Sequence, residues 1–164
     1  MTAANSITLT NGNARDAAYD LVLLAHVLSA LVGFGAVVVA GAFALALARS
    51  GPDADPVRRY YRPGVNWAGR VLFLVPVFGF ALIGLSHGEW SLSDGWITIG
   101  LMLWAGAALV AEVVLWPAER SLQMAVGEGR PVADIRARCH QVAALSGVFL
   151  VVLVVATVVM VGKP

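Results

Sequence analysis

The chain has 164 residues, of which 59% are hydrophobic and 13% are charged, with a formal net charge of +1. Soluble domains carry roughly a quarter charged residues, so this composition excludes an ordinary soluble domain and indicates an integral membrane protein. The basic residues lie between apolar runs rather than on one face, which argues against a nucleic-acid partner.

Residues 1–18 are mostly small and polar and contain an Asn-Gly-Asn turn signal at 11–13. We interpret this stretch as a flexible polar tail. A single transmembrane domain is expected to occupy residues 19–164. The lipid bilayer is therefore the first partner that the sequence predicts.

Four apolar runs follow the tail, at about residues 19–48, 65–85, 96–116 and 141–162. Each run is close to or longer than the ~20 residues with which a helix crosses a bilayer. Pro76 lies within the second run, where neighbouring helices can tolerate a kink. Pro117 follows the third run and is expected to end it. The sequence therefore predicts an all-α fold, a four-helix integral membrane bundle.

The arginines between the runs predict the orientation of the bundle. The linker after the first run and the linker after the third run hold Arg49, Arg58, Arg59, Arg62, Arg120, Arg130, Arg136 and Arg138. Loop 86–95 holds no Lys or Arg. Because basic loops stay in the cytoplasm, we expect both termini outside (N-out/C-out) in a bacterial inner membrane.

The linker 117–140 has two interpretations that the sequence leaves open. It can form an amphipathic cytoplasmic helix or a loose connection. Gly127, Gly129 and Pro131 are expected to break it in the middle in either case.

Small residues recur along the first run. Ala36, Ala40, Ala44 and Ala48 are each four residues apart, which places them as a stripe on one face of a helix. Such stripes let membrane helices approach closely, and tight packing is the simplest interpretation.

Few ionisable residues lie within the runs, and each is a functional hypothesis by default because a charge at membrane depth is costly. Arg70 and Glu112 fall at a similar depth on the same side, so we predict that they form an intramembrane ion pair. A structural pair, or two side chains that reach to the interface, is the simpler interpretation. A proton or anion site is the functional one.

His26 lies inside the first run, and its imidazole can ligate a metal or heme, relay a proton or bond to a neighbouring helix. Cys139 and His140 are adjacent and point about 100° apart on a helix, so they make a poor chelate. No metal site is predicted, and no Cys-x-x-Cys, phosphate loop or nucleophile elbow occurs. The sequence therefore gives no signal of an ordinary enzyme, and no cofactor is predicted from these patterns alone.

Several short segments carry a family resemblance. Residues 23–30, Leu-Leu-Ala-His-Val-Leu-Ser-Ala, are followed by Gly33 and Gly35; residues 116–120 read Trp-Pro-Ala-Glu-Arg, and the chain ends Val-Gly-Lys-Pro. This layout resembles the family of bacterial integral membrane proteins filed as domain of unknown function 2269. The resemblance covers nearly the whole chain and implies the four-helix fold without a biochemical role.

A more distant likeness is to the small heme-binding membrane protoporphyrinogen oxidases, which share the histidine of the first helix and the Lys-Pro ending. That likeness implies His26 as a heme ligand. The copper-resistance membrane domains share the same histidine, but Met102, Met124 and Met160 are not at ligand spacing here.

Three functional hypotheses follow, in order of preference. The first is a noncatalytic accessory or stabilising subunit of a larger membrane complex, with a membrane-protein partner or a homo-oligomer. The second is a heme-linked membrane redox protein that uses His26. The third is a small oligomeric transporter that uses Arg70 and Glu112.

Overall fold

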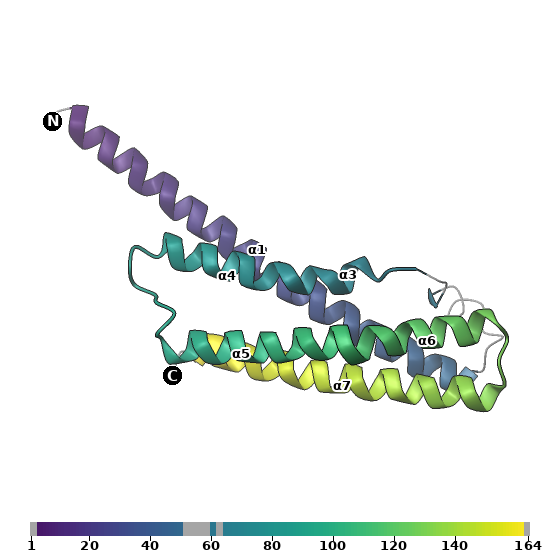
Figure 1. Ribbon diagram of the computed structural model, residues 1–164. Coiled ribbons are helices and arrows are strands. Elements are labelled where there is room, and N and C mark those ends of the chain that lie inside the picture. Colours follow the sequence, from purple (N-terminus) through teal and green to yellow (C-terminus); the bar gives the residue numbers. More distant parts are fainter. Residues whose placement is uncertain (1–2, 51–59, 62–63, 163–164) are drawn as a thin grey trace.

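A computed structural model describes residues 3–50, 60–61 and 64–162 of the chain, with side chains from residue 16 onward (Figure 1). Four helical segments are long and apolar enough to cross a membrane: Asp16–Ser50, Trp67–Leu85, Gly95–Gly127 and Val132–Gly162. No strand occurs among the described residues. The all-α, four-span fold expected from the sequence is confirmed.

The first helix, α1 (Ala3–Ser50), is the element on which the others pack. It contacts α7, α4 and α3, and its first turns extend beyond the other helices (Figure 1). The helix begins at Ala3, so the boundary expected at Tyr19 is not observed. Asn and Gly lower helix propensity by about 1 kcal/mol or less each, whereas proline is far more disruptive, and the turn signal at 11–13 contains no proline.

The second span is built from three short helices in one line: α3 (Trp67–Arg70), the 3₁₀ turn η1 (Val71–Phe73) and α4 (Leu74–Leu85). Asn66 caps α3, since its side chain accepts a hydrogen bond from the Gly69 N–H at 3.1 Å. Pro76 has no N–H to offer the Leu72 carbonyl one turn earlier. The indole N–H of Trp104 in α5 donates to that carbonyl instead, at 2.9 Å. A neighbouring helix thus satisfies the backbone group that the proline frees.

The third span continues past the point where the sequence predicted its end. It comprises α5 (Gly95–Val110), the π-helical turn η2 (Ala111–Leu115) and α6 (Trp116–Gly127). The expectation that Pro117 ends this helix is wrong. Pro117 lies in the first turn of α6, where its missing N–H is tolerated, directly after the wider π turn.

The fourth helix, α7 (Val132–Gly162), begins before residue 141, where the sequence placed its start. The expected linker 117–140 is therefore mostly helical, as the end of α6 and the start of α7. The break falls at the predicted glycines, and Gly129 takes a left-handed backbone conformation with φ of 64°.

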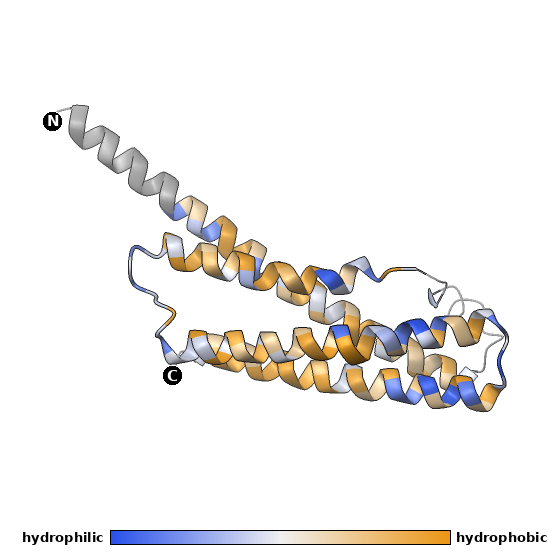
Figure 2. Cartoon of the chain, in the orientation of Figure 1, coloured by the Kyte–Doolittle hydropathy of each residue, from blue (hydrophilic) through white to orange (hydrophobic). Residues whose placement is uncertain are grey.

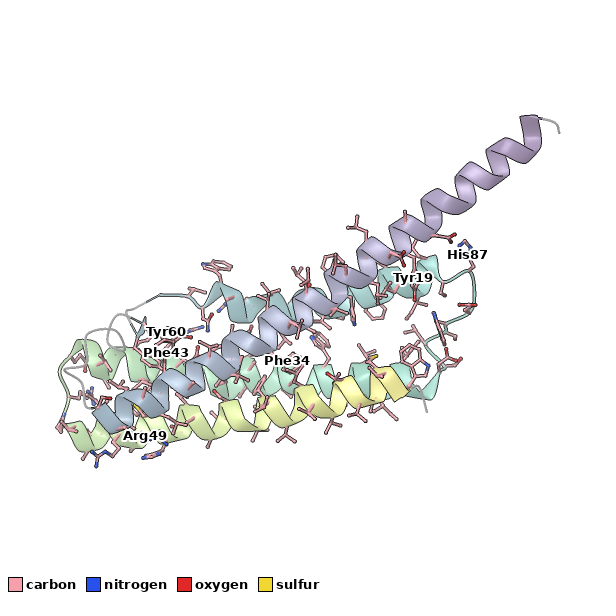
Figure 3. All side chains as sticks on the ribbon, turned by 180° about the vertical axis from the view of Figure 1, so that it is seen from behind. Tyr19, Phe34, Phe43, Arg49, Tyr60 and His87 are labelled. Atoms are coloured by element: carbon pink, nitrogen blue, oxygen red, sulfur yellow. The ribbon has the colours of Figure 1, made fainter. Side chains whose placement is uncertain are left out.

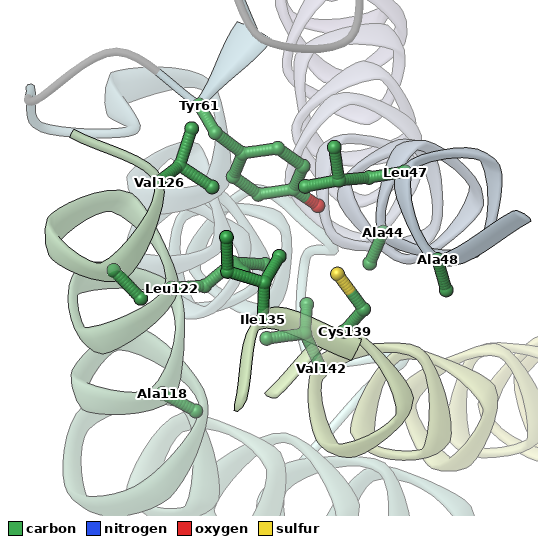
Figure 4. Packing of buried hydrophobic residues seen from close by; sticks show 11 residues of the cluster. Ala44, Leu47, Ala48, Tyr61, Ala118, Leu122, Val126, Ile135, Cys139 and Val142 are labelled. Carbon is green, nitrogen blue, oxygen red and sulfur yellow. The ribbon is translucent and has the colours of Figure 1, made fainter. Parts of the chain in front are cut away.

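Two buried apolar clusters hold the helices together. One lies at the end where α6 meets α7 and joins both helices to α1 and to Tyr61; it consists of Ala44, Leu47, Ala48, Tyr61, Ala118, Leu122, Ala125, Val126, Ile135, Cys139 and Val142 (Figure 4). The other lies in the middle of the bundle and includes Phe34, Leu72 and Phe149. The rest of the surface along the spans is largely hydrophobic, as lipid contact requires (Figure 2).

Small residues on α1 allow the closest helix contacts. Ala40, Ala44 and Ala48 of the predicted stripe are buried, and Ala36 is half-buried. Gly33 and Gly41 share this role: a Cβ at Gly33 would lie 2.6 Å from the Leu72 nitrogen, and one at Gly41 would overlap the Ser146 side chain of α7. The stripe is therefore used within the chain, for packing against α7 and the second span.

The two ends of the bundle differ in chemistry. Tyr19, His87 and the two described chain ends lie at one end, and Arg49 and Tyr60 lie at the other, near the α6–α7 turn (Figures 1 and 3). Hydrophilic residues gather along α6 and α7 at this second end (Figure 2). Arg58, Arg59 and Arg62 lie outside the described residues. We call the end with Arg49 the basic end.

Candidate functional site

His26 connects α1 to α4. Its Nδ1 lies 2.9 Å from the carbonyl oxygen of Val75. A carbonyl oxygen can only accept, so Nδ1 carries the proton and donates, and Nε2 is left with its lone pair. His26 thus makes a hydrogen bond to a neighbouring helix, which was one of its interpretations from the sequence.

An apolar cavity of about 70 Å³ lies beside His26, between α1, α4, α5 and α7. Trp104, Gly79 and Met160 are among the residues that line it. Drug-sized ligands and cofactors occupy pockets of roughly 300–1,000 Å³. The space beside His26 therefore does not fit a porphyrin as the helices are packed.

Arg70 and Glu112, the expected ion pair, are not brought together. The Arg70 guanidinium carbon lies 4.9 Å from the centre of the Trp116 ring and 5.8 Å from that of Trp67. Glu112 is exposed on η2. Within the described ranges, the ion pair that forms is Arg130–Glu128, at 2.8 Å in the α6–α7 turn.

The π turn explains why Glu112 faces away. Glu112 and Glu119 are seven residues apart, a spacing that places two residues on one face of a regular α-helix. The π-helical η2 between them closes on i→i+5 bonds and changes the register. As a result Glu112 is exposed, whereas Glu119 is buried with 5% of its surface exposed.

Glu119 is the functional candidate that the sequence reasoning missed. The Asn66 side chain hydrogen-bonds to its carboxylate. The other oxygen, Oε1, is buried and has no hydrogen-bond partner among the described residues, and the same holds for the Trp116 Nε1. Both groups are at the basic end, where the structure leaves polar atoms unsatisfied.

A polar pocket of about 180 Å³ surrounds Glu119. It is lined by Tyr60, Tyr61, Gly64, Val65, Asn66, Glu119 and Gln123. A smaller hollow of about 20 Å³ shares Asn66, Glu119 and Gln123 with it and adds Arg70, Trp116 and Arg120. Because the two spaces share lining residues, we call them together the Glu119 pocket. It combines a carboxylate, two amides and two arginines at one place.

The two tyrosines of the Glu119 pocket are held in place by contacts with residues outside the pocket. The Tyr61 hydroxyl donates to the Ala40 carbonyl, and the Tyr60 ring stacks on Phe43 with ring centres 4.2 Å apart (Figure 3). Burial raises the pKa of both hydroxyls, and the nearby Glu119 carboxylate adds to the effect. Both tyrosines therefore remain neutral at physiological pH.

The other two histidines and the cysteine lie elsewhere. His87 is exposed in the loop after α4, at the opposite end from the Glu119 pocket. Cys139 is buried and His140 is exposed on α7, so the two adjacent side chains point apart as expected. In the described parts of the chain, no three His, Cys, Asp or Glu side chains cluster as a metal site.

Comparison with known protein families finds a match for the chain. Residues 20–164 match the family described as a predicted integral membrane protein, DUF2269. The chain belongs to the DUF2269 family. The match covers all four spans and confirms the resemblance seen in the first helix and in the chain ending. No curated protein and no solved structure matches, so the heme and copper likenesses gain no support.

Proposed function

We propose that this DUF2269 protein is a noncatalytic accessory subunit of a larger membrane complex. Two glycines in the middle of the spans carry the proposal, Gly106 on α5 and Gly147 on α7. Both are exposed, and a Cβ built at either would meet nothing within 4 Å. The protein's own packing does not require glycine there, whereas contact with another membrane helix favours it.

The polar side chains of the spans support a structural role. His26 and Trp104 both bond to backbone carbonyls of the second span. Ser29 and Thr157 bond to carbonyls of their own helices, at 2.7 and 2.8 Å. These bonds hold helices in place, and Arg70 and Glu112 do not meet as the transporter hypothesis requires.

The partner contact can be tested at the two glycines. We expect Gly106→Leu and Gly147→Leu to reduce at least tenfold the membrane protein that co-purifies with the tagged chain after gentle detergent extraction. A Cβ at either position meets nothing within the chain, so the thermal stability of the variants should not fall. Native mass spectrometry measures the complex and distinguishes a second copy from a different protein.

Gly84→Leu is the matched control, since Gly84 on α4 is also exposed and open. It lies away from α5 and α7 and should keep the complex. Recovery of the wild-type chain only as a monomer, or a complex that both α5 and α7 variants retain, would count against the proposal.

We further propose that the basic end faces the cytoplasm of a bacterial inner membrane, with both termini outside. The arginines of the described linkers lie at that end, and the positive-inside rule assigns it to the cytoplasm. A cysteine at Ser93, in the exposed loop before α5, should react with a membrane-impermeant maleimide in intact cells. A cysteine at Glu128, in the α6–α7 turn, should react only after permeabilisation. The reverse pattern would invert the topology.

A further inference from the structure

The Glu119 pocket contains a buried carboxylate with an oxygen, Oε1, that has no hydrogen-bond partner among the described residues. Asn66 accepts from the Gly69 N–H through Oδ1, so its amide N–H is what it offers to the Glu119 carboxylate. Among the described residues, Glu119 Oε1 has no donor although the residue is only 5% exposed. Buried charges in proteins are paired or hold a cation. The pocket therefore presents an acceptor for a cationic N–H donor from outside the chain.

The same pocket presents cationic donors a short distance away. Arg70 and Arg120 line the smaller hollow together with Glu119. The Arg70 guanidinium lies over the rings of Trp67 and Trp116, and it makes no hydrogen bond or ion pair within the described residues. Stacking leaves its in-plane N–H groups available, and a guanidinium is well suited to a phosphate.

We propose that the Glu119 pocket binds a phosphoethanolamine group, with the primary ammonium on Glu119 and the phosphate on Arg70 and Arg120. The main pocket of about 180 Å³ has room for the ammonium group, whereas the hollow of about 20 Å³ has room for about one water. The phosphate therefore lies outside the hollow, on the exposed side of Arg120. The group can belong to the lipid phosphatidylethanolamine or to free phosphoethanolamine. This inference is independent of the proposed partner contact on α5 and α7, since it uses other residues.

The level of the pocket favours the lipid source. Trp67 begins the second span and is 72% exposed. Tryptophans mark the depth of lipid headgroups at the ends of spans. Trp67 contacts Arg70, so this cationic donor of the pocket lies at that depth.

The aromatic rings around the pocket disfavour a quaternary ammonium. Choline groups are recognised by open aromatic faces. Here Phe43 stacks on Tyr60, the edge contact of Tyr60 with Tyr61 is 5.2 Å between centres, and Arg70 covers Trp116. A quaternary ammonium also has no N–H for Glu119 Oε1. The pocket should therefore prefer ethanolamine to choline.

The preference can be measured on the full-length protein in detergent. Tryptophan fluorescence follows titration with dioctanoyl-phosphatidylethanolamine, dioctanoyl-phosphatidylcholine and free phosphoethanolamine. We expect the ethanolamine lipid to bind at least tenfold more tightly than the choline lipid. Glu119→Gln should remove this preference, and Arg70→Gln should weaken ethanolamine-lipid binding. Glu112→Gln is the matched control, because that carboxylate is exposed on η2, and it should keep the preference.

Binding of the lipid but not of free phosphoethanolamine would identify the bilayer as the source, and binding of both would include the soluble compound. Equal affinity for the two lipids in the wild-type protein would overturn the proposal, as would a Glu119→Gln variant that keeps the preference. The two-lipid comparison uses the wild-type chain, so it decides the matter even where Glu119→Gln does not fold. Loss of the partner complex in the Gly106 and Gly147 variants has no bearing on this result.

Discussion

Replacing Gly33 with valine is expected to destabilise the bundle by about 3 kcal/mol, the upper end of the usual range for overpacking. A Cβ at Gly33 would lie 2.6 Å from the nitrogen and 2.8 Å from the Cα of Leu72. These are backbone atoms, so no rotamer change relieves the contact. The segment is also held from the other side, because Leu72 is fully buried and Trp104 bonds to its carbonyl. Helix α1 would have to move away from the second span.

Gly35→Val, on the same helix, is the control for that substitution, since a Cβ at Gly35 meets nothing within 4 Å. Valine has a somewhat better helix propensity than glycine, so the free energy of unfolding of this variant should stay equal or rise slightly. Thermal unfolding in detergent, followed by circular dichroism, measures both variants. Equal stability of the two variants would mean that α1 does not pack on η1 as the structure shows.

The fold was predictable because lipid imposes strong rules. A chain with so few charges must bury its backbone polar groups in helices, and four runs of span length leave one simple architecture. The role of Pro76 was also foreseeable, since a proline within a run requires a neighbour to satisfy the freed carbonyl. The identity of that neighbour, Trp104, depends on how α5 packs against η1, which no local pattern states.

The helix ends and the Glu119 pocket were not predictable, and one local feature explains both. Proline usually ends a helix, so the sequence predicted a linker over residues 117–140. Glu119 falls in that range and was therefore not predicted to be a buried carboxylate. The π turn η2 carries the helix through the proline. It also rotates Glu112 outward and Glu119 inward, which reversed the choice of carboxylate near Arg70. A π turn has no dependable sequence signal.

Removing the side-chain hydrogen bonds to the second span should lower the free energy of unfolding of the bundle. His26→Leu removes the donor to the Val75 carbonyl, and Trp104→Phe removes the donor to the Leu72 carbonyl. Interhelical hydrogen bonds in membranes contribute about 0.6 kcal/mol on average and up to about 1.7. We expect about 1 kcal/mol for each single variant. The double variant should lose more than the sum, because both carbonyls lie beside Pro76 in one short segment.

The same His26→Leu variant separates the packing role of the histidine from the heme role implied by the distant likeness. His140→Leu is the control, since His140 is exposed on α7. Because the cavity of about 70 Å³ beside His26 is too small for a porphyrin, we expect the purified wild-type protein to show no heme absorption band, oxidised or reduced. A band that His26→Leu abolishes and His140→Leu keeps would require α4 and α5 to separate, and His26 would then act as a ligand through Nε2. Loss of stability without any band would leave His26 as the donor that holds α4 against α1.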